Sequence, residues 1–255
     1  MHDSRLKQNS QISFMQLALH LADSVLILAQ RNAEWCGHGP VLEQDIALTN
    51  ITLDLVGQAR SLYQYAAHHI GGEVTEDSLA YTRLEHEYLN GLLVEQPNGD
   101  WAQTVLRQFF FSAYQSAYYT QLEKCTDKDL SAIAEKSLKE IRYHLRWSSE
   151  WVIRLGDGTD ESHSRMKEAL ENLWPFTGEW LEPADYELSL GFLNADQLKQ
   201  DWQTTVRNVL EEASLSYPAP VHMHTGGKYG RHTEHMGYIL SELQYMQRAY
   251  PHSQW

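Results

Sequence analysis

One short stretch of the chain places an acid and a histidine at a spacing suited to metal binding. Glu140 and His144 stand four residues apart, so on a helix their side chains are neighbours on one face. Helical bundles that hold two metal ions instead use a glutamate and a histidine three residues apart, both directed into the bundle. The residue three before His144 is Ile141. The glutamate is displaced by one position, and the stretch therefore predicts an incomplete site.

The rest of the chain adds few of the ligands that such a centre needs. A bundle site for two irons takes about six protein ligands, most of them carboxylates. No histidine follows Asp54 by three or four residues, and Ser112 occupies the centre of an aromatic helical segment where a carboxylate would be needed. We therefore expect no catalytic residue and no metal in this chain, with His144 and Glu140 as a vestigial position. The alternative that stays open is a divergent metal-dependent oxidase that uses Glu140 and His144, together with Asp54.

A histidine-rich segment near the C-terminus is a second candidate for metal binding. Its residues of metal-ligand type are His222, His224, His232, Glu234 and His235. His-x-His and His-x-x-His spacings beside an acid can bind zinc. A polar loop that leads into a helix explains the same residues, and we favour that interpretation. Zinc binding used for association with another protein stays the alternative.

Apolar residues recur with a helical period along most of the chain, so helices must position these residues. We predict helices over residues 13–33, 41–70, 76–91, 100–123, 127–155, 162–181 and 194–213, with a last one around residues 236–246. Pro175 kinks or breaks the sixth of them. We find neither the two-residue alternation of strands nor the glycine-rich turn of a βαβ unit.

Two of these segments carry well-defined apolar faces. In residues 127–155 the face consists of Ala134, Leu138, Ile141, Leu145, Ser148, Val152 and Leu155, which alternate by four and three. In residues 41–70 the residues near one face are Leu42, Ile46, Thr49, Leu53, Val56, Leu62 and Tyr63. The pattern predicts an all-α protein with four long helices and several shorter ones. We expect a single domain over residues 1–255, with residues 1–12 disordered.

Composition and charge exclude several classes of partner. With 34 acidic and 20 basic residues the formal net charge is -14, which argues against nucleic acid because phosphate binding needs clustered Lys and Arg. No apolar run approaches the roughly 18 residues needed to span a bilayer, and the first residues lack the apolar region of a secretory signal. We therefore expect a cytoplasmic protein without a membrane partner. The 8 Trp and 14 Tyr suit an extensive protein interface.

Several longer stretches resemble one known family. They are Glu34–Pro40, Leu53–Arg60, Leu93–Gly99, Arg142–Arg146 and Thr225–Lys228. Together they resemble the C subunit of the ring-1,2-phenylacetyl-coenzyme A (phenylacetyl-CoA) epoxidase, a bacterial multicomponent oxygenase. The resemblance runs from about residue 14 to Trp255. The chain departs from the family at Ser112, where the family often has an aspartate.

The resemblance implies a fold and a division of labour. The fold would be a ferritin-like four-helix bundle with additional helices. The chain would be a non-catalytic structural subunit that pairs with a catalytic A subunit, which holds the di-iron centre, while a small B subunit bridges the assembly. A separate reductase with FAD and a 2Fe-2S cluster would supply electrons from NADPH. The complex would place an epoxide on the aromatic ring of phenylacetyl-CoA with molecular oxygen, at the start of aerobic phenylacetate degradation.

The resemblance also implies that coenzyme A lies near the subunit interface. The residues expected to contact it are Glu87, Tyr88, Leu89, Asn90, Leu188, Ser189 and Leu190. Neither stretch contains a phosphate-binding motif. The substrate is thus an expectation from resemblance, whereas the incomplete set of metal ligands follows from the residues themselves.

Overall fold

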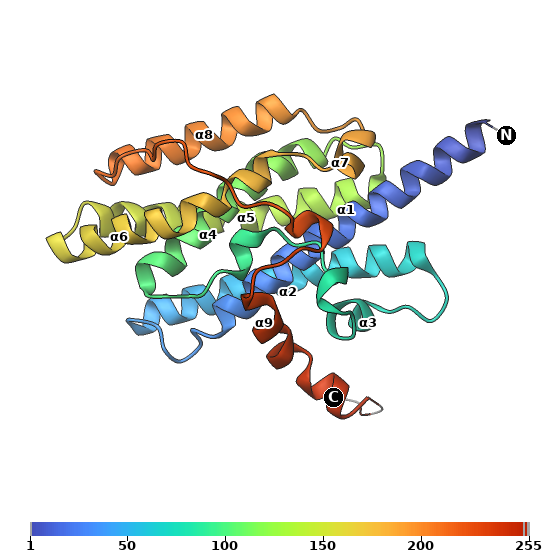
Figure 1. Ribbon diagram of the computed structural model, residues 1–255, viewed down its shortest axis with the longest axis horizontal. Coiled ribbons are helices and arrows are strands. Elements are labelled where there is room, and N and C mark those ends of the chain that lie inside the picture. Colours follow the sequence, from blue (N-terminus) through green and yellow to red (C-terminus); the bar gives the residue numbers. More distant parts are fainter. Residues whose placement is uncertain (1, 252, 254–255) are drawn as a thin grey trace. The chain divides into compact units, whose positions relative to one another are not determined.

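The computed structural model describes residues 2–251 and 253, with the side chains of residues 10 onward. Helices dominate the fold and no strand occurs in this part of the chain, which confirms the predicted all-α class (Figure 1). The long helices are α1 (His2–Ala33), α2 (Leu42–Ile70), α4 (Trp101–Leu122) and α5 (Lys128–Gly156). The shorter helices are α3 (Glu76–Tyr81), α6 (Asp160–Leu173), α7 (Asp185–Ser189), α8 (Ala195–Glu212), α9 (His235–Leu243) and α10 (Tyr245–Ala249). The short 3-10 turns are η1 (Glu85–Glu87), η2 (Leu92–Glu95), η3 (Trp174–Phe176), η4 (Gly178–Leu181) and η5 (Gly227–Tyr229).

The chain divides into two compact units, each built on a pair of long helices. The first unit comprises Met1–Glu95, Ala184–Gly191 and Gly226–Trp255, and the second comprises Gln96–Pro183 and Phe192–Thr225. In the first unit α1 packs along α2, and in the second unit α4 packs along α5. The four predicted long helices are confirmed as elements, whereas a single domain over the whole chain stays a prediction.

Helix α1 forms much of the core of the first unit. Residues Ser10–Ala33 are long enough to cross a membrane, and an 18-residue window within them has a mean hydropathy of 1.7. The expectation that no apolar run approaches this length is therefore wrong. However, 72% of that window is buried inside the protein, as the core helix of a folded domain must be. The helix begins at His2, within the segment 1–12 that we expected to be disordered, and Met1 lies outside the described residues.

Most of the apolar face predicted on α2 points outward, whereas its last two residues, Leu62 and Tyr63, are buried. Its residues Leu42, Ile46, Leu53 and Val56 are 71%, 52%, 64% and 42% exposed. The apolar side chains that this helix buries include Leu48, Ile51, Leu55, Ala59 and Leu62. Helix α2 therefore carries apolar residues on two sides, and only one of these sides packs within the chain.

Local capping residues determine where the helices of the second unit begin. The Asp100 side chain accepts a hydrogen bond at 3.0 Å from the backbone N–H of the third residue of α4. Asp127 and Asn194 cap α5 and α8 in the same way. Helix α6 ends before Pro175, which confirms the predicted break. The predicted helix starts at residues 100, 127 and 194 agree with these caps, each of which involves residues only two or three positions apart.

One predicted helix is much shorter than expected. The helix expected over residues 76–91 is α3, which ends at Tyr81, and an irregular connection with η1 and η2 follows it. The backbone carbonyls of Tyr88 and Leu89 and the N–H of Leu89 bond to buried side chains elsewhere in the first unit. In this segment, hydrogen bonds to distant side chains have therefore replaced the helical hydrogen bonds that the apolar periodicity predicted.

Candidate functional site

The stretch with the spacing of a metal site lies on α5 in the second unit. Ile141 and His144 are fully buried, whereas Glu140 is half-buried. Of the predicted apolar face, Ala134, Leu138, Ile141, Ser148 and Val152 are buried, and Leu145 and Leu155 are half-buried. The helix thus packs through Ile141, the position where a bundle metal site needs an inward carboxylate.

Helix α4 places neutral polar side chains in the core of the same unit. Gln108, Ser112 and Gln115 are buried, and Gln108 Nε2 donates a hydrogen bond to Ser112 Oγ at 2.9 Å. Burial raises the pKa of the Tyr119 phenol, and the negative charge of Glu140 adds to the rise. Within residues 2–251 and 253, no group of three His, Cys, Asp or Glu side chains could hold a metal ion.

In the first unit, a buried carboxylate on α1 is fully occupied by hydrogen-bond donors. Asp23 accepts hydrogen bonds from both terminal nitrogens of Arg83, from Tyr63 Oη at 2.5 Å and from the backbone N–H of Leu89 at 2.8 Å. Burial raises the pKa of the Tyr63 phenol well above its usual value, and the charge of Asp23 raises it further. A carboxylate offers about four acceptor positions. These four donors occupy them, so Asp23 is a structural residue. Asp54 is half-buried on α2 and belongs to no potential metal-binding group among the described residues.

Two further buried ion pairs lie in the first unit. Lys228 Nζ donates to Glu187 Oε2 at 2.8 Å, and the two side chains are 2% and 1% exposed. Burial raises the pKa of the Glu187 carboxyl, but Lys228, His20 and the backbone N–H of Ala184 together outweigh this effect, and the pKa is lowered. The second pair joins His232 Nδ1 to Glu95 Oε1 at 2.6 Å, with both side chains fully buried. Sequence reasoning missed these pairs because the partners are 41 and 137 residues apart.

His232 belongs to the histidine-rich segment, and both of its ring nitrogens are engaged. Nδ1 donates to Glu95, and Nε2 donates to the backbone carbonyl of Tyr88 at 2.9 Å. Because both partners are acceptors, this arrangement favours the ring with two protons and a positive charge. Burial lowers the pKa of His232, but the hydrogen bond and the charge of Glu95 outweigh it and the pKa is raised.

His232 is not available as a ligand for a zinc site in the histidine-rich segment. Zinc binds the lone pair of a neutral imidazole, and the ring of His232 has no lone pair left. In the second unit, the His224 ring stacks on Phe176 with centroids 4.8 Å apart and meets the His222 ring edge to face at 5.8 Å. The segment is thus used for packing and for a buried ion pair.

The segment Glu87–Asn90, predicted to contact coenzyme A, is held in place by these buried pairs. The carbonyl of Leu89 accepts from His20 Nδ1 at 2.7 Å, and Asn90 Nδ2 donates to Glu95 Oε1 at 2.9 Å. Tyr88 and Asn90 are fully buried. Glu87 is exposed and its carboxylate accepts from the backbone N–H at the start of η1.

Leu89 and Ser189 line one pocket of about 490 Å³ in the first unit. Its lining residues are Ser13, Gln16, Leu89, Asp185, Tyr186, Ser189, Lys228 and Tyr229. The fold thus brings together one residue from each of the two stretches predicted to contact coenzyme A. Leu188 is exposed and Leu190 half-buried, and neither lines the pocket. Lys228, the base in the lining, is already paired with Glu187.

Comparison with known proteins places the chain in a family. All of it, residues 1–255, matches the family model described as phenylacetic acid catabolic protein. It is 46% identical over 241 residues to the C subunit of the 1,2-phenylacetyl-CoA epoxidase of Escherichia coli (strain K12), an alignment that covers 93% of this chain and 97% of that relative. These matches confirm the resemblance carried by the sequence motifs, and the helical architecture agrees with the ferritin-like fold of the family. The chain belongs to the phenylacetic acid catabolic protein family.

Proposed function

We propose that this chain is a non-catalytic structural subunit of a phenylacetyl-CoA 1,2-epoxidase complex in aerobic phenylacetate degradation. Its direct partner is the catalytic A subunit, which holds the di-iron centre. The E. coli relative supports this assignment, because it is itself named as one subunit of an epoxidase and a subunit functions within a larger assembly. A bridging B subunit, a reductase with FAD and a 2Fe-2S cluster that takes electrons from NADPH, and a cytoplasmic location belong to the same proposal.

The observation that carries the pairing is the outward stripe of α2, formed by Leu42, Ile46, Thr49, Leu53 and Val56. These residues alternate by four and three, which is the seam spacing of two helices packed side by side. The stripe extends over about 21 Å at a rise of 1.5 Å per residue. Four of its five residues are apolar and exposed, with the half-buried Thr49 between them, and such a surface marks a protein–protein contact.

The surroundings of the outward stripe indicate which partner it fits. A Cβ atom added to Gly57, beside the stripe, would have no other atom within 4 Å, so a second helix can approach closely. Glu43 and Asp45 flank its first turn, and the whole chain has a formal net charge of -14. A second copy would bring like charges together, which is unfavourable. We therefore assign the stripe to a helix of the A subunit with an apolar seam and flanking bases.

The buried positions on α4 and α5 support the non-catalytic part of the proposal. Ile141 stands where a metal ligand would be required, and Ser112 is a neutral residue in the core of the same unit. With these side chains the helix pair contributes packing, and oxygen activation is left to the A subunit. The chain would then stabilise its partner and shape the surface through which substrate reaches the iron centre.

The coenzyme A portion of the substrate is proposed to lie at the pocket lined by Leu89 and Ser189. This placement is supported by the convergence of two separately predicted stretches on one pocket. Ser189→Trp fills the pocket from its exposed rim. It should raise the KM of the complex for phenylacetyl-CoA about tenfold while the subunits still co-purify. An unchanged KM in an intact complex would remove this pocket from the substrate path.

Co-expression tests the structural role directly. The A subunit should be soluble and active with this chain and should aggregate or lose activity without it. Leu53→Arg places a charge in the middle of the outward stripe and should abolish co-purification, because an unpaired charge cannot be buried in a helix interface. Tyr238→Arg is the matched control, since Tyr238 is 73% exposed in the same unit but lies on α9.

Two outcomes would contradict the proposal. An A subunit that is equally soluble and active alone has no need of a scaffold. Co-purification that survives Leu53→Arg, or is lost equally with Tyr238→Arg, would show that the outward stripe is not the contact surface.

The alternative, a divergent metal oxidase built on Glu140 and His144, makes a different prediction. It requires nearly stoichiometric iron or manganese in the isolated chain, and elemental analysis of the purified protein measures this directly. A metal-free chain that still supports the activity of the A subunit removes the alternative.

A further inference from the structure

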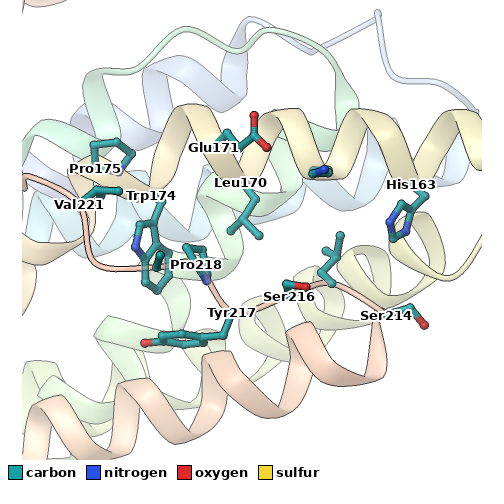
Figure 2. A pocket seen from close by; sticks show the side chains of 13 residues that line it. His163, Leu170, Glu171, Trp174, Pro175, Ser214, Ser216, Tyr217, Pro218 and Val221 are labelled. Carbon is teal, nitrogen blue, oxygen red and sulfur yellow. The ribbon is translucent and has the colours of Figure 1, made fainter.

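A pocket in the second unit has no part in the proposed function. It lies between α6 and the segment of residues 214–221, and its volume is about 520 Å³. Figure 2 shows His163, Leu170 and Trp174 pointing toward this segment, where Tyr217 and Pro218 lie opposite them. Sites for small molecules are concave, mostly apolar and about 300–1,000 Å³ in volume. This pocket has the size and the lining of such a site.

The aromatic wall of the pocket is held in a fixed arrangement. The rings of Trp174 and Tyr217 meet edge to face with centroids 5.0 Å apart. The guanidinium of Arg207 lies 4.1 Å from the centroid of the Tyr217 ring. The backbone N–H of His224 donates to the carbonyl of Pro175 at 2.8 Å, which ties the segment beyond the pocket to η3. A flat apolar ligand would therefore meet a preformed aromatic surface, formed mainly by the half-buried Tyr217 with the buried Trp174 behind it.

Basic side chains line the pocket toward the N-terminal end of α6. His163 and Lys167 stand one helical turn apart, and His163 Nδ1 donates to the carbonyl of Gly156 at 2.6 Å, which fixes the orientation of the ring. Lys167 makes no hydrogen bond or ion pair with the described part of the chain. Glu171 is the acid in the lining, and Figure 2 shows its carboxylate directed away from the segment 214–221. An anionic group at this end would be attracted to Lys167.

The spacing of the two features defines the ligand. Lys167 and Trp174 are seven residues apart, which is about 10 Å along a helix. A ring system can lie against Trp174 and Tyr217 while an acid group of the same molecule reaches the lysine. We propose that this pocket binds a small aromatic monocarboxylate, with its ring against Trp174 and Tyr217 and its carboxylate at Lys167.

Calorimetric titration of the full chain tests the proposal with two probes of the same shape. 2-Naphthoate carries the carboxylate, and 2-naphthamide replaces it with a neutral amide. Naphthoate should bind saturably with one site per chain, and more tightly than the amide. Lys167→Gln should weaken naphthoate binding by about two- to fivefold, as expected for a solvent-exposed ion pair, and leave the amide unaffected.

Two further variants locate the site. Lys199→Gln removes an exposed lysine of α8 and should leave the affinity for naphthoate unchanged. Ala219→Trp fills the pocket from an exposed loop position and should abolish binding of both probes, with an unaltered circular dichroism spectrum as proof of folding. The proposal is overturned if naphthoate shows no saturable binding, if the amide binds equally well, or if binding survives Ala219→Trp.

Discussion

The two units of the molecule use buried polar side chains in different ways. In the first unit three buried carboxylates, Asp23, Glu95 and Glu187, each contact a base. In the second unit the buried polar residues of α4 include the neutral pair Gln108 and Ser112, which bond to each other. A buried charge is costly unless it is paired and hydrogen-bonded. The carboxylates of the first unit are therefore committed to the fold, whereas the buried charge on α4, Arg107, donates hydrogen bonds to the neutral acceptors Gln96 and Asn98.

This difference shows that an acidic chain need not be rich in metal ligands. The ion pairs of the first unit fix two irregular segments, residues 82–95 and 226–233, onto its helices. A carboxylate that holds a loop in this way has its acceptor positions filled. In the second unit, the helix that should supply an inward acid has Ile141. Two positions where a metal ligand could be expected are thus used differently: the Asp23 carboxylate is occupied by hydrogen-bond donors, and an apolar residue stands at position 141.

The comparison is tested most severely by breaking one ion pair of the first unit. Arg83→Met leaves Asp23 fully buried without its base, since the Arg83 side chain is only 10% exposed. The free energy of unfolding should fall by about 3–5 kcal/mol. Urea titration followed by circular dichroism measures this change.

The control for Arg83→Met comes from the second unit. Arg165 pairs with Asp100 and Glu161 at the surface, and its side chain is 54% exposed. Arg165→Met should leave the urea midpoint nearly unchanged because water replaces the lost partners. Adding Asp23→Asn to Arg83→Met should recover part of the loss, because the uncompensated charge is removed. Equal effects of the two arginine variants would contradict the distinction between the units.

Acidification should also act mainly on the first unit. Burial lowers the pKa of His20 from 6.5 to about 4, with Lys228 adding to the effect. As the pH falls, the unfolded chain therefore binds this proton at a higher pH than the folded chain does. The contribution of His20 to stability is complete above pH 6.5 and is lost as the pH drops toward 4. The loss from this group should be about 3 kcal/mol. Urea titrations at several pH values measure it.

His232 changes stability in the opposite sense. Its pKa is raised in the folded chain, so its contribution is full below about pH 6.5 and is lost as the pH rises through the higher folded value. His20→Asn keeps a donor for the carbonyl of Leu89 but cannot titrate, and it should flatten the acid side of the profile only. If the loss of stability at acid pH persists in His20→Asn, groups other than His20 cause it.

The sequence predicted what depends on near neighbours along the chain. The predicted helix starts at residues 100, 127 and 194, where Asp100, Asp127 and Asn194 form the caps, and the break at Pro175 each follow from residues a few positions apart. The ion pair of Arg83 with Asp23 joins residues 60 positions apart, and no local pattern reports such a contact. The same contact explains why the helix expected over residues 76–91 stops early.

Periodicity alone could not assign the apolar face of α2. The spacing of Leu42, Ile46, Leu53 and Val56 is that of a packed helix face, whether the neighbour belongs to the same chain or to another. Only their exposure separates the two cases. By contrast, Ile141 correctly indicated that this face of α5 packs in the core. An apolar residue at the position of a required metal ligand can be recognised from the sequence alone.

The smallest predicted effect concerns the residue that first indicated a metal. His144 is fully buried on α5, and His144→Leu replaces it with an apolar side chain on an already apolar face. If this helix only packs, the free energy of unfolding should fall by no more than about 2 kcal/mol, the cost of a lost buried hydrogen bond. Epoxidase activity of the assembled complex should then be unchanged. A folded, co-purifying His144→Leu chain that abolishes turnover would instead make His144 a working ligand, and the oxidase alternative would replace the structural role. Ser148→Ala, one turn further along the same buried face, distinguishes the two cases, because it perturbs the packing of α5 without touching the imidazole.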